Sequence, residues 1–161
     1  MKNIRAFFLL VAFFLSNSTF CHERKYRIDK VHFSNAWHEF YDFIAHESEI
    51  DDPLIIQGKR MVPAICSAVA HEDMKYRRYA IGALGYIKDR RAIPCLERIL
   101  KNKKELEYFR GDALESIYRI DQEIGKKYAD KFRKDKEYLR IISDHIRSGK
   151  IEIDESGLDG H

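Results

Sequence analysis

The stretch YRRYAIGALGYIKDRRAIPCLERIL, residues 76–100, joins two helix-like segments through a short polar turn. In its first half, Ile81, Leu84 and Ile87 recur at three-residue steps, which places them on one face of a helix. The second half carries Pro94 near its start, where a helix tolerates proline because the first N–H groups have no helical partner. The stretch therefore predicts a pair of helices.

This helix pair recurs along the chain. Residues 109–120 repeat the first half at an offset of 33, which aligns Arg110 with Arg77. Residues 60–69 repeat the second half at an offset of 31, which aligns Pro63 with Pro94. A period in the low thirties built from helix pairs is typical of a solenoid, in which each pair buries its apolar face against the next.

These repeats resemble the HEAT-like repeats of the phycobilin-lyase type, whose pattern is an Arg, then Ala-x-x-Ala-Leu-Gly, then Asp-x-Arg-Ala-x-Pro-x-Leu. The match is close over residues 74–101, fair over 58–70 and 107–124, and faint elsewhere. The second copy departs from it, with Ser116-Ile117-Tyr118 at the place of Ala-Leu-Gly. The matching positions are Arg77, Ala80, Ala83, Leu84, Gly85, Asp89, Arg91, Ala92, Pro94 and Leu96.

The resemblance implies an all-α fold, a short α-α superhelix of about three helix pairs with a capping helix at its C-terminal end. Small residues at Ala80, Ala83 and Gly85 indicate close approach between neighbouring helices. Asp89 and Asp121 precede second helices, and we expect their side chains to cap exposed N–H groups.

The expected organisation has four parts. Residues 1–18 form a signal peptide, 19–35 a polar N-terminal lead, 36–148 the repeat domain and 149–161 an acidic flexible tail. The first helix of the domain is expected to carry one apolar face made by Trp37, Phe40, Phe43 and Ile44. The later helices are expected over about 60–71, 75–88, 91–102, 106–120, 122–133 and 135–148.

The N-terminus has the features of a secretory signal. Lys2 and Arg5 precede an apolar run over residues 6–15, which is short for a permanent membrane span. Export across an inner membrane to the periplasm is the favoured reading, and a retained anchor is the alternative. A lipoprotein anchored at Cys21 is a further alternative, although Phe20 occupies a position that normally needs a small residue.

The net charge of the whole chain is small. The formal value is +3, and loss of the two basic residues of the signal leaves about +1. Nucleic acid is therefore disfavoured as a partner. A membrane partner is expected only if Cys21 is lipidated.

Three cysteines leave at least one outside any intramolecular bond. An exported protein can oxidise Cys66 and Cys95, but adjacent helices lie about 8–10 Å apart and a disulfide needs α-carbons within about 7 Å. In the repeat alignment Cys66 matches Glu97 rather than Cys95, so it is expected to point outward. The redox state stays open, with a bond between the two disfavoured.

Histidine followed by glutamate occurs four times, and His with carboxylate can bind a metal. Another HEAT-like family, the deoxyhypusine hydroxylases, holds iron on such pairs inside the repeat. Here Arg77 and Arg78 occupy that place, so a solvated surface is the favoured reading. No nucleophile motif or phosphate loop occurs, and we expect no catalysis and no cofactor. The weak metal candidates are His38, His46 and His71.

Two tyrosines suggest a contact surface. Tyr79 and Tyr86 lie seven residues apart with Gly82 between them, and they align with Asp112 and Arg119, which are polar and expected to be exposed. Exposed tyrosines suit protein contacts, unless the polar lead covers them. Outward positions on the second helices add further candidates, although charge there is more often plain solvation. They are Lys59, Arg60, Glu97, Arg98 and Lys101.

The sequence thus predicts an exported scaffold or adaptor that binds another protein through a HEAT-like surface. One alternative is an immunity protein that neutralises an antibacterial toxin in the envelope. Another alternative is a metal-dependent enzyme that uses the His-Glu pairs.

Overall fold

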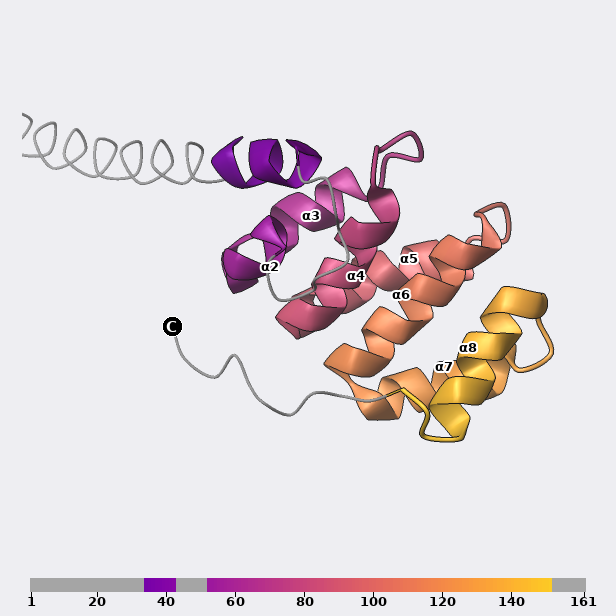
Figure 1. Ribbon diagram of the computed structural model, residues 1–161. Helices are drawn as coiled ribbons and strands as arrows, with labels where there is room; N and C mark the ends of the chain where they lie inside the picture. Colours follow the sequence, from indigo (N-terminus) through magenta and orange to yellow (C-terminus); the bar gives the residue numbers. More distant parts are fainter. Residues whose placement is uncertain (1–33, 43–51, 152–161) are drawn as a thin grey trace, which may run out of the picture. The chain divides into compact units, whose positions relative to one another are not determined.

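The computed structural model describes residues 34–42 and 52–151, and all regular structure in these ranges is helical (Figure 1). The all-α prediction is therefore confirmed for this part of the chain. Two units divide between Glu39 and Phe40, and the elements from α2 onward belong to the second. No helix in the described ranges is long and apolar enough to cross a membrane.

The α-helices of the second unit follow the predicted order from α3 onward. The bounds of the elements from α2 onward are α2 Pro53–Ile56, η1 Gly58–Arg60, α3 Val62–Ala68, α4 Arg77–Ile87, η2 Arg90–Ala92, α5 Ile93–Lys101, α6 Glu107–Ile120, α7 Gln122–Phe132 and α8 Glu137–Arg147.

Differences from the predicted bounds lie at the helix ends. The helix expected over 60–71 is shorter, because η1 forms a separate 3-10 turn ahead of α3. The short helix α2 was not predicted, and Asp52 caps it by accepting a hydrogen bond from the Leu54 N–H at 2.8 Å. Residues 34–42 are helical, and they include residues 34 and 35 of the predicted polar lead. The predicted signal segment, Cys21, Phe43, Ile44, His46 and residues 152–161 lie outside the described residues.

Helix α6 is the centre of the second unit. It packs against α4, α5, α7 and α8, and α4, α6 and α8 lie side by side in Figure 1. Gly85 of α4 allows this packing, since a Cβ on it would lie only 2.9 Å from the Ser116 Cα of α6. Ser116 also donates its hydroxyl to the Ile81 carbonyl at 2.9 Å. Ser116, which stands where the repeat pattern has Ala, thus adds a hydrogen bond between the two helices.

The predicted caps are present. The Asp89 carboxylate accepts from the Arg91 N–H, and the Asp121 carboxylate accepts from the Ile124 N–H at 3.0 Å. Pro63 and Pro94 lie in the first turns of α3 and α5.

The expectation for the two cysteines was wrong. Cys66 of α3 and Cys95 of α5 form a disulfide, with Cα atoms 5.7 Å apart. The interaxial distance between helices overstates the separation of facing residues, because each Cα lies about 2.3 Å from its own axis. The alignment at an offset of 31 residues also predicted the wrong orientation for Cys66. This residue is half-buried and bonded to Cys95 instead of pointing outward.

Candidate protein-binding surface

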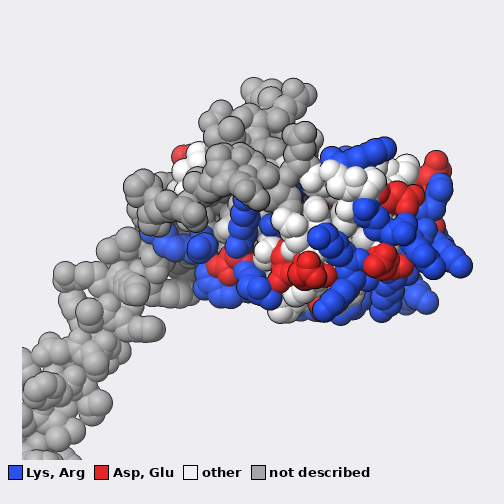
Figure 2. All heavy atoms as spheres, turned by 90° about the horizontal axis from the view of Figure 1, so that it is seen from below, with Lys and Arg blue, Asp and Glu red and all other residues white. Residues whose placement is uncertain are grey.

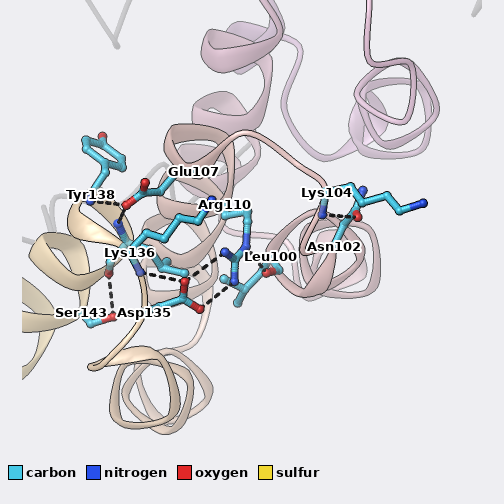
Figure 3. Close-up of polar contacts among 10 residues, drawn as sticks. Leu100, Asn102, Lys104, Glu107, Arg110, Asp135, Lys136, Tyr138 and Ser143 are labelled. Carbon is cyan, nitrogen blue, oxygen red and sulfur yellow. Dashed lines mark hydrogen bonds and ion pairs between the residues drawn. The ribbon is translucent and has the colours of Figure 1, made fainter.

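Arg110, near the start of α6, is buried and joins three elements. Its Nε donates to the Leu100 carbonyl at the end of α5, at 3.0 Å. Its Nη1 and Nη2 donate to Oδ1 and Oδ2 of Asp135, between α7 and α8, at 3.2 and 3.0 Å (Figure 3). The guanidinium centre also lies 5.5 Å from the Phe132 ring centroid. This guanidinium holds the pKa of Asp135 below its usual range.

Arg77, the aligned residue at the start of α4, makes contacts of the same kinds. Its Nε donates to the Val69 carbonyl at 2.8 Å, beyond the end of α3. Its Nη2 donates to Glu105 Oε2 at 2.8 Å, and its guanidinium centre lies 4.8 Å from the Phe109 ring centroid. Each arginine thus ties the end of one helix to the loop that follows the next helix pair.

This arrangement decides the charge of two loops. Glu105 and Asp135 are the acidic residues of the α5–α6 loop, 102–106, and the α7–α8 loop, 133–136, and each is paired with a buried arginine. The other charged residues of these loops are basic, exposed and without an ion pair in the described part of the chain. We call this set the basic loop edge: Lys103, Lys104, Arg133, Lys134 and Lys136. Figure 3 shows Lys104 extending away from Arg110.

The helical part is far more basic than the whole chain. Residues 52–151 contain 23 Lys and Arg and 15 Asp and Glu, a net charge of +8, whereas the full sequence has +3. On the face in Figure 2, blue side chains predominate, with red ones dispersed among them. The expectation of small excess charge came from averaging over acidic segments outside these residues. Counting charge by segment would have revealed the asymmetry.

The predicted tyrosine surface is only partly exposed. Tyr79 is 43% exposed, and a Cβ on Gly82 would meet nothing within 4 Å. Tyr86 is half-buried, with the Arg119 guanidinium centre 4.5 Å from its ring centroid. Helix α4 therefore presents Tyr79 and Gly82 more openly than Tyr86.

The predicted exposure of Asp112 was wrong. This residue is 9% exposed, and its Oδ2 accepts from Arg78 Nε at 2.7 Å. Its Oδ1 accepts from the Tyr138 hydroxyl of α8 at 3.0 Å. Burial raises the pKa of Asp112, while Arg78 opposes the rise. Burial, together with the Asp112 carboxylate, raises the pKa of Tyr138 to about 12.

Two of the predicted second-helix residues meet on α5. Lys101 Nζ lies 2.6 Å from Glu97 Oε2, and the Tyr128 hydroxyl of α7 donates to Glu97 Oε1 at 2.6 Å. The hydrogen bond from Lys101, which has the larger effect, and the one from Tyr128 lower the pKa of Glu97. Lys59 and Arg60 lie in η1, where the Lys59 carbonyl accepts from Arg91 Nη2 at 2.8 Å.

Arg98, another predicted residue, borders a cleft of about 230 Å³. The cleft lies among the end of α3, the start of α4 and α5. The disulfide forms part of its wall, and the charged or polar residues that line it are Glu72, Arg77, Arg98, Asn102 and Glu105. Of these, only Arg98 was predicted from the sequence to be a contact residue.

The histidine candidates are not brought together in the described residues. His38 lies on the helix 34–42, His71 follows α3, and His46 is outside the described ranges. Within those ranges, no group of three or more His, Cys, Asp and Glu side chains could hold a metal ion. Comparisons with known protein families, curated proteins and solved structures find no match for this chain.

Proposed function

We propose that the chain is an exported scaffold of HEAT-like helix pairs that binds an acidic protein surface through the basic loop edge. One observation carries this proposal. Glu105 and Asp135 are paired with buried arginines, so every unpaired charge of the two loops is positive. Complementary potentials steer such a partner to the edge and set its register.

The HEAT-like part of the proposal is supported by the two arginines. Arg77 and Arg110 lie 33 residues apart and bond in the same manner to a helix-end carbonyl, a loop carboxylate and an aromatic ring. Repeated helix pairs hold their loops in fixed relative positions, which offers a partner a preformed surface. Preformed surfaces lose little conformational entropy on binding.

The distribution of acidic residues favours protein over nucleic acid. Exposed carboxylates are dispersed among the basic residues, including Glu123 and Asp130, whose side chains are 80% and 69% exposed. Double-stranded DNA carries one negative charge per about 1.7 Å of its axis and would meet these carboxylates. An acidic protein patch can avoid them, because its charges are local.

The test uses the oxidised full chain as bait in an envelope extract treated with nuclease. A captured protein is then purified, and its affinity is measured by calorimetry for wild type and Lys104→Glu/Lys134→Glu. We expect the double reversal to weaken binding by at least about tenfold, because it replaces two attractive charge pairs with repulsive ones. Added salt should weaken wild-type binding and leave the variant less affected.

A matched control separates local charge from net charge. Lys127→Glu/Lys150→Glu makes the same change in total charge at exposed positions outside the two loops. We expect this control to bind within about twofold of wild type, since charges beyond a Debye length of about 8 Å are largely screened. Equal weakening by both variants, or capture that depends on nucleic acid, would contradict the proposal.

A further inference from the structure

The wall of the cleft beside the disulfide includes Arg77, whose side chain has a buried donor without an acceptor. Arg77 is 3% exposed and lines the cleft. Its Nη1 has no hydrogen-bond partner. Every other buried side-chain nitrogen or oxygen among the described residues has one. Buried donors are normally satisfied, because leaving one unpaired forfeits the hydrogen bond it makes with water.

The second copy of the arginine indicates which group is missing. Arg110 Nη1 is satisfied by Oδ1 of Asp135, and the residue 33 positions before Asp135 is Asn102, a neutral side chain that lines the cleft. The residue 33 positions before Phe132 is Ile99, which also lines the cleft. At the position of the Phe132 ring, the first copy therefore has the smaller side chain of Ile99. At the position of the Asp135 carboxylate, it has the neutral side chain of Asn102.

We propose that this cleft receives the carboxylate of one Glu or Asp side chain from the partner protein, an inference that rests on the proposed function. The carboxylate accepts a hydrogen bond from Arg77 Nη1, as Asp135 accepts from Arg110 Nη1. Arg98, exposed at the cleft and without an ion pair in the described residues, supplies a second positive charge. A cleft of about 230 Å³ has room for one side chain of this size.

The other charges of the cleft restrict the occupant. Glu105 is paired with Arg77, and Glu72 is exposed, so the cleft admits one carboxylate and repels a dense acidic cluster. Asn102 and Glu105 belong to the loop that also carries Lys103 and Lys104. An acidic segment bound on the basic loop edge therefore runs beside the cleft, with one side chain close enough to enter.

A nuclear magnetic resonance titration of the oxidised full chain tests the inference without a partner. The probe is N-acetyl-glutamate N-methylamide, and its isosteric control is N-acetyl-glutamine N-methylamide. The signals to follow are the Arg77 Nε–H group and the amides of Val69 and Asn102. We expect saturable shifts with the acid and binding at least about tenfold weaker with the amide, since hydrogen bonds to charged groups are the stronger ones.

Two variants locate the site without disturbing the buried arginine. Asn102→Asp supplies the carboxylate from within the chain and should weaken binding of the acid by at least about tenfold. Arg98→Gln should weaken it several-fold by removing the second positive charge. The inference is overturned if the acid causes no saturable shift, if the amide binds equally, or if Asn102→Asp binds the acid as wild type does.

A third ligand distinguishes the source of the carboxylate. If free glutamate binds about tenfold more tightly than the blocked residue, the cleft is a site for a free amino acid. That result would overturn the proposal that a side chain of the partner protein enters it. Failure of this titration leaves the effect of Lys104→Glu/Lys134→Glu on partner binding unchanged. Conversely, if Lys104→Glu/Lys134→Glu binds the partner as wild type does, the proposed function fails. The result of the carboxylate titration is independent of that outcome.

Discussion

Arg110 holds both carboxylate oxygens of Asp135, with Nη1 3.2 Å from Oδ1 and Nη2 3.0 Å from Oδ2. The same guanidinium donates through Nε to the Leu100 carbonyl. One side chain therefore connects α5, α6 and the α7–α8 loop, and it does so from a buried position. Paired, fork-like contacts of this kind fix geometry as well as adding stability.

Loss of the Asp135 charge should destabilise the protein in a pH-dependent manner. Arg110 lowers the folded-state pKa of Asp135, so its stabilisation is present above the unfolded pKa of about 3.9 and disappears as pH falls through the lower folded value. We expect Asp135→Asn to lower the free energy of unfolding by about 1.5–3 kcal/mol at neutral pH and by little in acid. Urea unfolding across this pH range measures the difference.

Asp130→Asn serves as the control for that series. Asp130 pairs with Arg147 on the surface, and the two side chains are 69% and 42% exposed. The variant should lose less than about 1 kcal/mol. A constant loss for Asp135→Asn over the whole pH range would show that its ionisation contributes nothing to stability.

Asp112 should show the opposite pH dependence. Burial raises its pKa in the folded state, so the contribution of this group is fully present below the unfolded pKa and is lost as pH rises through the folded one. The stability of Asp112→Asn relative to wild type should therefore improve as pH rises, whereas that of Asp135→Asn declines. The same unfolding series measures both, and like trends for the two variants would contradict the assignment.

Local features of the fold could be predicted from the sequence. The three-residue steps of Ile81, Leu84 and Ile87 depend only on helix geometry, and all three side chains are buried. The caps at Asp89 and Asp121 depend on nearby residues in the chain, and the structure confirms them. Signals of this kind survive because tertiary packing does not alter them.

Features that depend on neighbouring helices could not be predicted. Exposure of Asp112 was inferred from its polar side chain, but α8 places Tyr138 against Asp112. The inward pairing of Glu105 and Asp135 had no sequence signal, although the aligned arginines were recognised. The basic loop edge follows from that pairing, so the candidate surface required the structure.

Two glycines of α4 provide a matched test of the packing. A Cβ on Gly85 would lie 2.9 Å from the Ser116 Cα, which is backbone and cannot move independently, whereas a Cβ on Gly82 would meet nothing within 4 Å. We expect Gly85→Ala to cost about 1–3 kcal/mol and Gly82→Ala to gain up to about 1 kcal/mol from helix propensity. Denaturant unfolding measures both, and equal effects would show that α4 and α6 do not meet at Gly85.

Removal of the disulfide should cause the largest loss among these variants. The bond links residues 29 apart, and a loop of that length restricts the unfolded chain by about 3–4 kcal/mol at 25 °C. In a Cys21→Ser background, which prevents exchange with the third thiol, Cys66→Ala, Cys95→Ala and the double variant should each lose about this amount. Reductant should destabilise the parent and leave the three variants unchanged. Additive losses from the two single variants, or a parent insensitive to reductant, would show that Cys66 and Cys95 are not bonded.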